Sequence, residues 1–223
     1  MSQPNDDFIA PVCHHPVEIL YQDEAILVIN KPSGLLSLSG KNPLNQDSVH
    51  FRLRQQIPHC LMVHRLDFPT SGLMVLALSK SVNAKLTQQF QQRLIEKHYV
   101  AMLEGHISPE SAVIDAAIAK HRFPLMKICQ HSGKAARSDY ALIAHLHEPA
   151  RSLVLFKPQT GRTHQLRLHS LHIGHPILGC DLYASASSED KAERLLLHAS
   201  YLRFIHPLTQ QPIAFHSPCP FLE

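Results

Sequence analysis

Acidic side chains are rare in three long stretches of this chain. Residues 48–95 hold a single carboxylate, Asp67, and residues 116–138 and 149–180 hold none. The whole chain has 18 Asp and Glu against 21 Lys and Arg, so its formal net charge is only +3. The acids are thus excluded from particular segments rather than from the protein, and those segments are candidates for contact with a polyanion.

Basic side chains do occur in the acid-free stretches. Those within residues 116–138 are Lys120, Arg122, Lys127, Lys134 and Arg137, and those within residues 149–180 are Arg151, Lys157, Arg162 and Arg167. One such stretch is compatible with an ordinary solvated loop. Their repetition favours a surface that binds phosphates.

Long apolar segments are also lacking. No run approaches the ~20 residues of a membrane-spanning helix, and the first residues have neither the basic nor the apolar region of a signal peptide. The five cysteines are scattered without a C-x-x-C pair, which argues against a disulfide framework and a zinc ribbon. We therefore expect a cytoplasmic protein with reduced thiols and no membrane partner.

Motifs for nucleotide cofactors and for serine hydrolases are absent. Neither G-x-x-x-x-G-K-[ST] nor G-x-G-x-x-G occurs, and Ser71 is not in a G-x-S-x-G elbow. Among the 18 histidines, four are close enough in sequence to resemble metal ligands: His164, His169, His172 and His175. Their spacing differs from H-E-x-x-H and no acid lies nearby. A metal-dependent hydrolase stays open as an alternative, but we expect no metal and no cofactor.

The hydrophobic pattern predicts more strands than helices. Branched and aromatic residues gather between turn residues in a series of predicted strands: 18–22, 25–30, 73–78, 96–104, 113–119, 136–144, 151–156, 195–205 and 213–215. Helices are expected at 50–57, 81–94 and 163–173, the last capped by Thr163. Many strands follow one another without a crossover helix, which favours an α+β fold with an antiparallel-rich sheet. Residues 1–17 are expected to be a polar, loosely held lead-in.

Asp67 stands among basic and turn-forming residues, in the string H-R-L-D-F-P-T-S-G that precedes the apolar run 73–78. A guanidinium within reach of this carboxylate would keep it ionised and fix its direction. A carboxylate held in this way suits a nucleophile or a general base. The alternative is that Asp67 only closes the turn before Pro69.

A second group of polar residues surrounds the start of the helix predicted at 163–173. His164 and Arg167 lie one turn apart on the same face, and Arg162 lies at the N-terminal turn. Donors gathered at a helix start suit a phosphate or a buried carboxylate, although a solvated basic face is the alternative. Tyr99, in the strand predicted at 96–104, either presents its ring to a base or is one more half-buried tyrosine.

Several short strings follow one another along the chain. They are N-K-P-S-G at 30–34, H-R-L-D at 64–67, T-S-G at 70–72, K-H-Y at 97–99, K-P-Q-T-G-R-T-H-Q-L-R-L-H at 157–169, G-H-P-I-L-G at 174–179 and L-L-L-H-A at 195–199. In order and in content they resemble the RluA family of pseudouridine synthases. The resemblance implies an α+β fold with a mixed, mainly antiparallel bipartite sheet, flanking helices and loops, and an active-site cleft between two lobes.

The resemblance also implies roles for particular residues. Asp67 falls on the essential aspartate, Tyr99 on the tyrosine that stacks against the target base, and Arg167 on the arginine that pairs with the aspartate. Arg65 falls on an arginine that helps displace the flipped uridine, and Leu197 on an apolar position of the uracil pocket. Further substrate-binding residues are expected to be His64, Arg162, His164 and Gln165, and RNA contacts are expected from Lys120, Arg122, Lys127, Lys134 and Arg137.

The implied reaction converts a uridine in RNA to pseudouridine. The N1–C1′ bond breaks, the uracil turns and a C5–C1′ bond forms, without net redox change, so no cofactor is required. Asp67 would either attack C1′ or remove the C2′ proton, and the sequence leaves both open. An RNA-binding protein that has lost catalysis is the other alternative.

The implied substrate is a structured RNA. Similarity to the small members of the family points to a uridine shared by a tRNA anticodon arm and a 23S rRNA hairpin. The absence of Trp and the 6% aromatic content argue against a broad stacking platform and favour recognition of a stem-loop by shape. Residues 18–223 are expected to form a catalytic domain without an S4-type RNA-binding domain, and the protein is expected to be a monomer. Segment 121–131 matches no family string, and such inserts often contact RNA.

Overall fold

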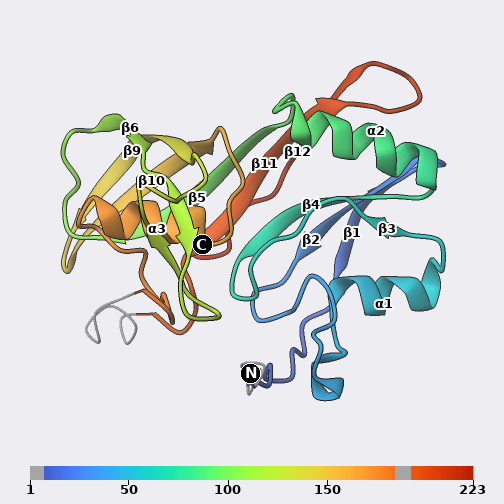
Figure 1. Ribbon diagram of the computed structural model, residues 1–223, viewed down its shortest axis with the longest axis horizontal. Coiled ribbons are helices and arrows are strands. Elements are labelled where there is room, and N and C mark those ends of the chain that lie inside the picture. Colours follow the sequence, from blue (N-terminus) through green and yellow to red (C-terminus); the bar gives the residue numbers. More distant parts are fainter. Residues whose placement is uncertain (1–7, 184–191, 223) are drawn as a thin grey trace. The chain divides into compact units, whose positions relative to one another are not determined.

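The computed structural model describes residues 8–183 and 192–222 (Figure 1). The chain divides into two compact units: unit 1 comprises Met1–Glu96 and Ala199–Pro218, and unit 2 comprises Lys97–His198 and Cys219–Glu223. Each unit has its own core of buried apolar residues. The predicted fold class is confirmed, because few helices accompany a mixed, mostly antiparallel sheet.

The strands of unit 1 follow the order β1–β2–β4–β11, with β3 paired to β4 and β12 paired to β11. Their bounds are Glu18–Gln22 for β1, Ile26–Lys31 for β2, Leu61–Met62 for β3, Ser71–Ala77 for β4, Leu197–Ile205 for β11 and Pro212–His216 for β12. β1 and β2 form the predicted hairpin. β2 and β4 pair in antiparallel register up to Lys31↔Gly72, which sets the end of β2 beside the start of β4.

Helices α1 (Val49–Gln56) and α2 (Lys80–Gln91) accompany these strands, with the short 3-10 helix η1 (Pro43–Asn45) before α1. Ser48 and Ser79 cap α1 and α2 by accepting backbone N–H bonds from Phe51 and Val82. α2 packs on one face of β2 and β4, and Figure 1 shows α1 on their other side. All seven residues of β4 are therefore buried, and this strand gives its neighbouring turn a rigid base.

Unit 2 has the strand order β5–β10–β9–β6, and β7 pairs with β8 in a separate hairpin. The bounds are Glu96–Glu104 for β5, Ser111–Asp115 for β6, Ile118–Lys120 for β7, Met126–Ile128 for β8, Arg137–His147 for β9 and Ala150–Pro158 for β10. The prediction of one strand at 113–119 is wrong. The last pair of β6 with β9 is Asp115↔Arg137, and the chain then leaves that sheet to pair with β8.

Helix α3 (Gln165–His172) is shorter than predicted, and Thr163 does not cap it. The N-cap residue is His164, which has a left-handed backbone (φ 57°) and makes no side-chain capping bond. The Gln165 side chain instead turns back and accepts the Arg162 N–H at 3.0 Å. α2 also ends earlier than predicted, because Arg93 adopts φ 60° and turns the chain out of the helix.

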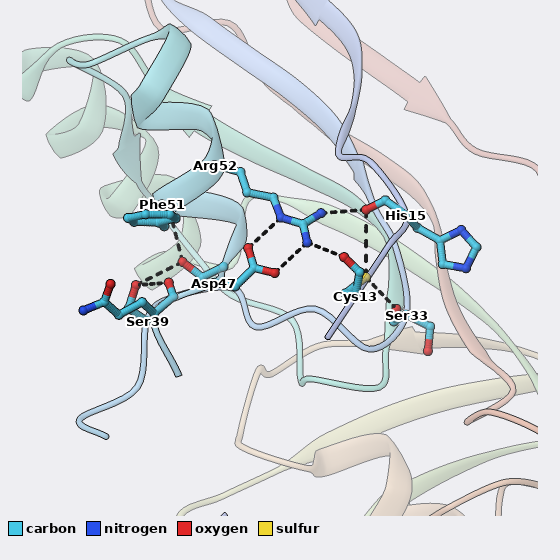
Figure 2. A network of polar contacts seen from close by, with 9 residues as sticks. Cys13, His15, Ser33, Ser39, Asp47, Phe51 and Arg52 are labelled. Carbon is cyan, nitrogen blue, oxygen red and sulfur yellow. Dashed lines mark hydrogen bonds and ion pairs between the residues drawn. The ribbon is translucent and has the colours of Figure 1, made fainter. Parts of the chain in front are cut away.

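The N-terminal segment 8–16 makes hydrogen bonds with other residues of unit 1, and the expectation of a loosely held lead-in stays a prediction. Figure 2 shows the Arg52 guanidinium between the Asp47 carboxylate and the backbone carbonyls of Cys13 and His15. At the start of the segment, Asn45 donates to the Phe8 carbonyl at 2.7 Å and accepts the Ala10 N–H at 2.8 Å. Residues 1–7 of the lead-in lie outside the described residues.

Candidate functional site

Asp67 lies on a turn of unit 1 that leads directly into β4. The Asp67 carbonyl accepts the Thr70 N–H at 3.1 Å, so Phe68 and Pro69 form the corner of the turn. Thr70 and Ser71 are buried, whereas Asp67 is half-buried. The expected turn is therefore present, and its acid is partly accessible to solvent.

The K-P-S-G string at 31–34 fixes the far side of this turn. Lys31 is fully buried, and its Nζ donates to the carbonyls of Pro32 at 2.8 Å and Phe68 at 3.0 Å. The Gly34 N–H also donates to the Phe68 carbonyl at 3.1 Å, and Ser33 Oγ donates to the Pro69 carbonyl at 2.7 Å. A buried ammonium bound to carbonyls places positive charge beside the loop that carries Asp67.

Ser37 fixes the near side of the turn. Its Oγ donates to the Leu66 carbonyl at 2.7 Å and accepts the Leu66 N–H at 3.1 Å, in a fully buried position. The backbone on both sides of Asp67 is thus tied to one loop, residues 31–37. The sequence placed no role on Ser37, because no local pattern shows that residue 37 meets residue 66.

The two basic neighbours of Asp67 differ in their surroundings. His64 Nε2 accepts the Val75 N–H at 3.0 Å, and its ring lies 4.6 Å from the Phe90 ring. His64 therefore supports β4, whatever contact it makes with a substrate. Arg65 is exposed and stands before the turn, so its guanidinium is open to a ligand from solution.

Arg167 lies on α3 and is deeply buried, with 1% of its surface exposed. Its Nη2 donates to Asp181, and its Nε donates to Cys180 Sγ at 3.3 Å. The guanidinium carbon lies 5.3 Å from the centre of the Tyr183 ring. Three neighbours thus fix the plane of this guanidinium.

The Gln165 side chain makes four hydrogen bonds within unit 2, and its expected contact with the substrate stays a prediction. Its Oε1 accepts Thr160 Oγ1 at 2.7 Å and the Arg162 N–H at 3.0 Å. Its Nε2 donates to the Arg137 carbonyl at 3.0 Å and to Ser138 Oγ at 2.9 Å. All the hydrogen-bonding capacity of a buried amide is used, so Gln165 shapes the loop that precedes α3.

That loop carries two further predicted site residues. Arg162 is half-buried and its Nε donates to the Ala135 carbonyl at 3.0 Å. His164 Nδ1 lies 2.6 Å from Tyr183 Oη. Arg162 and His164 thus lie on the loop that leads into α3, and Tyr183 contacts both His164 and Arg167.

Tyr99 and Leu197 belong to one apolar cluster of unit 2. Leu197 is 3% exposed, and half-buried Tyr99 packs against the cluster, opposite Phe156 in the β5–β10 register. Lys97, two residues before Tyr99, approaches Gly161 with its Nζ, and burial lowers the pKa of this ammonium. Tyr99 thus lies on the strand from which Lys97 extends toward the loop before α3.

The basic residues of the segment 116–138 are all exposed: Lys120, Arg122, Lys127, Lys134 and Arg137. Lys120 and Lys127 lie in β7 and β8, and Arg122 lies in the turn between these strands. Arg137 is 3.8 Å from Asp115 in an exposed ion pair. The β7–β8 hairpin therefore presents cations to solvent on an ordered scaffold.

The histidines of α3 do not form a ligand set. His169 is fully buried, with Nδ1 3.0 Å from Ser138 Oγ and Nε2 3.0 Å from the Ala116 carbonyl. Burial lowers the pKa of this imidazole, since desolvation disfavours its charged form. Within residues 8–183 and 192–222, no group of three or more His, Cys, Asp or Glu has a metal-binding arrangement. In the same ranges, no helix has the length and hydropathy of a membrane-spanning segment.

Comparison with known proteins identifies relatives of this chain. Residues 25–172 match the family described as RNA pseudouridylate synthase. The chain is 43% identical over 205 residues to the dual-specificity RNA pseudouridine synthase RluA of Escherichia coli K12, across 91% of this chain and 93% of the relative. It is 40% identical over 209 residues to RluA of Vibrio vulnificus, across 92% and 84% of the two chains. Human RNA pseudouridylate synthase domain containing 1 has a similar structure, with 32% identity, a TM-score of 0.78 and coverage of 95% and 86%. The chain therefore belongs to the RluA family of pseudouridine synthases, isomerases that act on RNA.

Proposed function

We propose that Asp67 is the carboxylate that acts on the ribose of the target uridine. The observation that carries this proposal is the double attachment of its turn, by Ser37 at Leu66 and by Lys31 and Ser33 at Phe68 and Pro69. Reaction at C1′ or C2′ requires an ionised carboxylate held in one place against the sugar. The hydrogen bonds that fix the backbone of the turn would hold the Asp67 carboxylate in one place.

Arg167 and Tyr99 are the proposed partners of Asp67. The family resemblance assigns Arg167 to the pairing with Asp67, and its fixed guanidinium plane supports this role. The resemblance assigns Tyr99 to stacking on the target uracil, and its half-buried ring beside Leu197 is consistent with an apolar pocket for a base. Stacking of this kind is worth ~1–3 kcal/mol per base, enough to offset much of the cost of flipping.

Arg65 and the β7–β8 hairpin are the proposed contacts with the rest of the RNA. Arg65 is exposed next to the turn and would fill the space that the flipped base vacates. The exposed cations of the hairpin would neutralise backbone phosphates. Arg162 and His164 are proposed to hold the target nucleotide, since both lie on the loop before α3.

The proposed RNA targets are a tRNA anticodon arm and a 23S rRNA hairpin. The choice of these two RNAs rests on the family resemblance of the sequence. The relatives that match most of the chain are named dual-specificity enzymes, which supports a second kind of RNA target. Mapping of pseudouridines in RNA from a strain that lacks this protein tests it. Loss of one site in each RNA supports dual specificity, and unchanged maps of both RNAs would refute the choice of targets.

The catalytic assignment is tested with Asp67→Asn and a matched control, Glu24→Gln, at an exposed acid of the same unit. The substrate is RNA transcribed with 5-tritiated uridine, because the isomerisation exchanges the hydrogen at C5. We expect Asp67→Asn to bind the RNA with near-normal affinity and release no tritium, and Glu24→Gln to match the wild type. Turnover by Asp67→Asn at more than about one-hundredth of the wild-type rate would sink the assignment.

A further inference from the structure

Tyr183 joins three parts of unit 2 that the proposed function treats separately. Its ring lies 5.3 Å from the guanidinium carbon of Arg167. Its Oη lies 2.6 Å from His164 Nδ1 and accepts the Met126 N–H at 2.8 Å. Met126 is the first residue of β8, in the exposed basic hairpin. One phenol side chain therefore contacts the buried arginine, the loop histidine and the hairpin.

We propose that Tyr183 is a positioning residue of the uridine isomerisation, which holds Arg167 through its ring and orients His164 through its hydroxyl. The inference rests on the proposed function, because it explains how the proposed substrate-facing groups keep their directions. It assigns no contact between Tyr183 and the reacting atoms.

The ring acts on the guanidinium. Arg167 donates in its own plane to Cys180 and Asp181, and the Tyr183 ring adds a contact by which a guanidinium is commonly held. A buried arginine that lost this contact would keep its charge but gain freedom to turn about its last bonds. The Tyr183 ring therefore affects the orientation of the Arg167 guanidinium more than its charge.

The hydroxyl acts on the imidazole. Oη accepts the Met126 N–H at 2.8 Å and lies 2.6 Å from Nδ1 of His164, so one oxygen links the imidazole to the hairpin. A hydrogen bond at Nδ1 restricts rotation of the ring and so fixes where Nε2, on its other side, points. His164 also has a left-handed backbone, which fixes where its side chain starts.

The β7–β8 hairpin is hydrogen-bonded to the same Tyr183 oxygen. Met126 N–H is bound to Tyr183, and the next residue, Lys127, is one of the exposed cations. Phosphates that bind the hairpin would stabilise β8, and with it the hydrogen bond to Tyr183. RNA binding at the hairpin and the orientation of His164 are in this way expected to depend on one another.

The first test compares Tyr183→Phe with Tyr140→Phe. Tyr140 lies in the same unit and its hydroxyl donates to the Pro109 carbonyl at 3.0 Å, so the control removes an equivalent atom away from Arg167. We measure the dissociation constant for the substrate stem-loop and the single-turnover rate at saturating enzyme. Tyr183→Phe is expected to weaken binding about five-fold, the usual effect of one lost hydrogen bond, and to keep the rate within about two-fold because the ring remains. Tyr140→Phe is expected to change neither quantity.

The second test is a double-mutant cycle with His164→Asn, a residue that tolerates the left-handed backbone. If the hydroxyl acts through His164, the double variant binds RNA no more weakly than His164→Asn alone. A merely structural role predicts additive losses. Additive losses, or wild-type binding by Tyr183→Phe, would overturn the inference.

The ring itself is tested by Tyr183→Leu, which should lower the saturated rate at least ten-fold below that of Tyr183→Phe. If folded Tyr183→Leu and folded Tyr183→Phe have equal rates, the ring has no role in holding Arg167. If Tyr183→Leu does not fold, the double-mutant cycle with His164→Asn still tests the role of the hydroxyl. Failure of the proposed function is recognised separately, since the wild-type protein would then form no pseudouridine in any RNA.

Discussion

The polar side chains that support the Asp67 turn bind backbone atoms, and Gln165 at the start of α3 does so in part. Lys31, Ser33 and Ser37 bind carbonyls of residues 66–69, and Gln165 binds the Arg137 carbonyl. Such bonds fix the path of the backbone. The side chain of Asp67 is then attached to a backbone of defined position. A substitution at these supports is expected to act on activity through geometry rather than through charge.

Arg167→Lys tests the need for a planar, forked cation. An ammonium keeps the charge but cannot donate to Cys180 and Asp181 while lying on the Tyr183 ring. We expect the tritium-release rate to fall at least ten-fold, with RNA affinity changed by less than about three-fold. The control is Arg203→Lys in unit 1, where an exposed arginine pairs with Glu96 at 3.6 Å, and it should have the wild-type rate. Near-normal turnover by Arg167→Lys would show that charge alone suffices.

At the scale of elements, β4 and β11 approach each other at a point that only glycine permits. Gly72 has φ 116°, and a Cβ at this position would lie 2.3 Å from the Ala199 carbonyl oxygen. Gly179 is similar, with φ 69° and a Cβ position 1.9 Å from the Arg194 carbonyl oxygen. The glycines of the T-S-G and I-L-G strings are therefore required by close backbone approach.

Gly72→Ala is expected to lower the free energy of unfolding by about 3 kcal/mol or more, because it combines strain with a backbone collision. Gly34→Ala is the control in the same unit, since Gly34 has φ 73° but no atom within 4 Å of its Cβ position. That variant should lose only the strain, roughly 1–2 kcal/mol. Urea denaturation measures both, and equal losses would contradict the role of the close approach.

The N-terminal segment 8–16 is a second element whose attachment can be tested. Arg52 binds it through the carbonyls of Cys13 and His15, and Phe8 lies 5.5 Å from the Phe68 ring of the Asp67 turn. Arg52→Gln removes the charged fork, so amide exchange in residues 10–16 should become about ten-fold faster or more, while β4 keeps its protection. Arg54→Gln is the matched control on the same helix, since Arg54 is exposed and binds only the local Pro58 carbonyl among the described contacts. Unchanged exchange in Arg52→Gln would mean that other contacts hold the segment.

At the scale of the whole molecule, the distribution of charge matters more than its sum. The net charge is +3, yet the stretch 116–138 has five exposed cations and no acid. Each phosphate that these cations neutralise releases counterions, which makes binding weaken with salt.

The double variant Arg122→Gln/Lys127→Gln tests this surface. We expect the slope of log affinity against log salt to become shallower by about 1.5, with weaker binding to all RNA sequences. The control, Lys41→Gln/Lys80→Gln, removes the same charge from exposed sites in unit 1. An equal change in both double variants would point to net charge rather than to the hairpin.

The sequence by itself determined much of the local structure and the family. The hairpin β1–β2, the buried strand β4, helices α1 and α2 and most strands of unit 2 follow from hydrophobic period and turn residues, because these signals depend on neighbours in the chain. The site residues Asp67, Tyr99 and Arg167 came from motif strings, and they stay a proposal that the experiments above address.

Only the tertiary structure decided how the site is supported. The binding of Lys31 and Ser37 to the Asp67 turn, the engagement of the Gln165 amide and the position of Tyr183 all join residues that are distant in the chain or held in unusual backbone conformations. The split of the strand predicted at 113–119 has the same origin, since the partner strand changes at Ala116 and Ala117. Periodicity reports which residues are apolar, whereas pairing between distant segments depends on the packing of the complete chain.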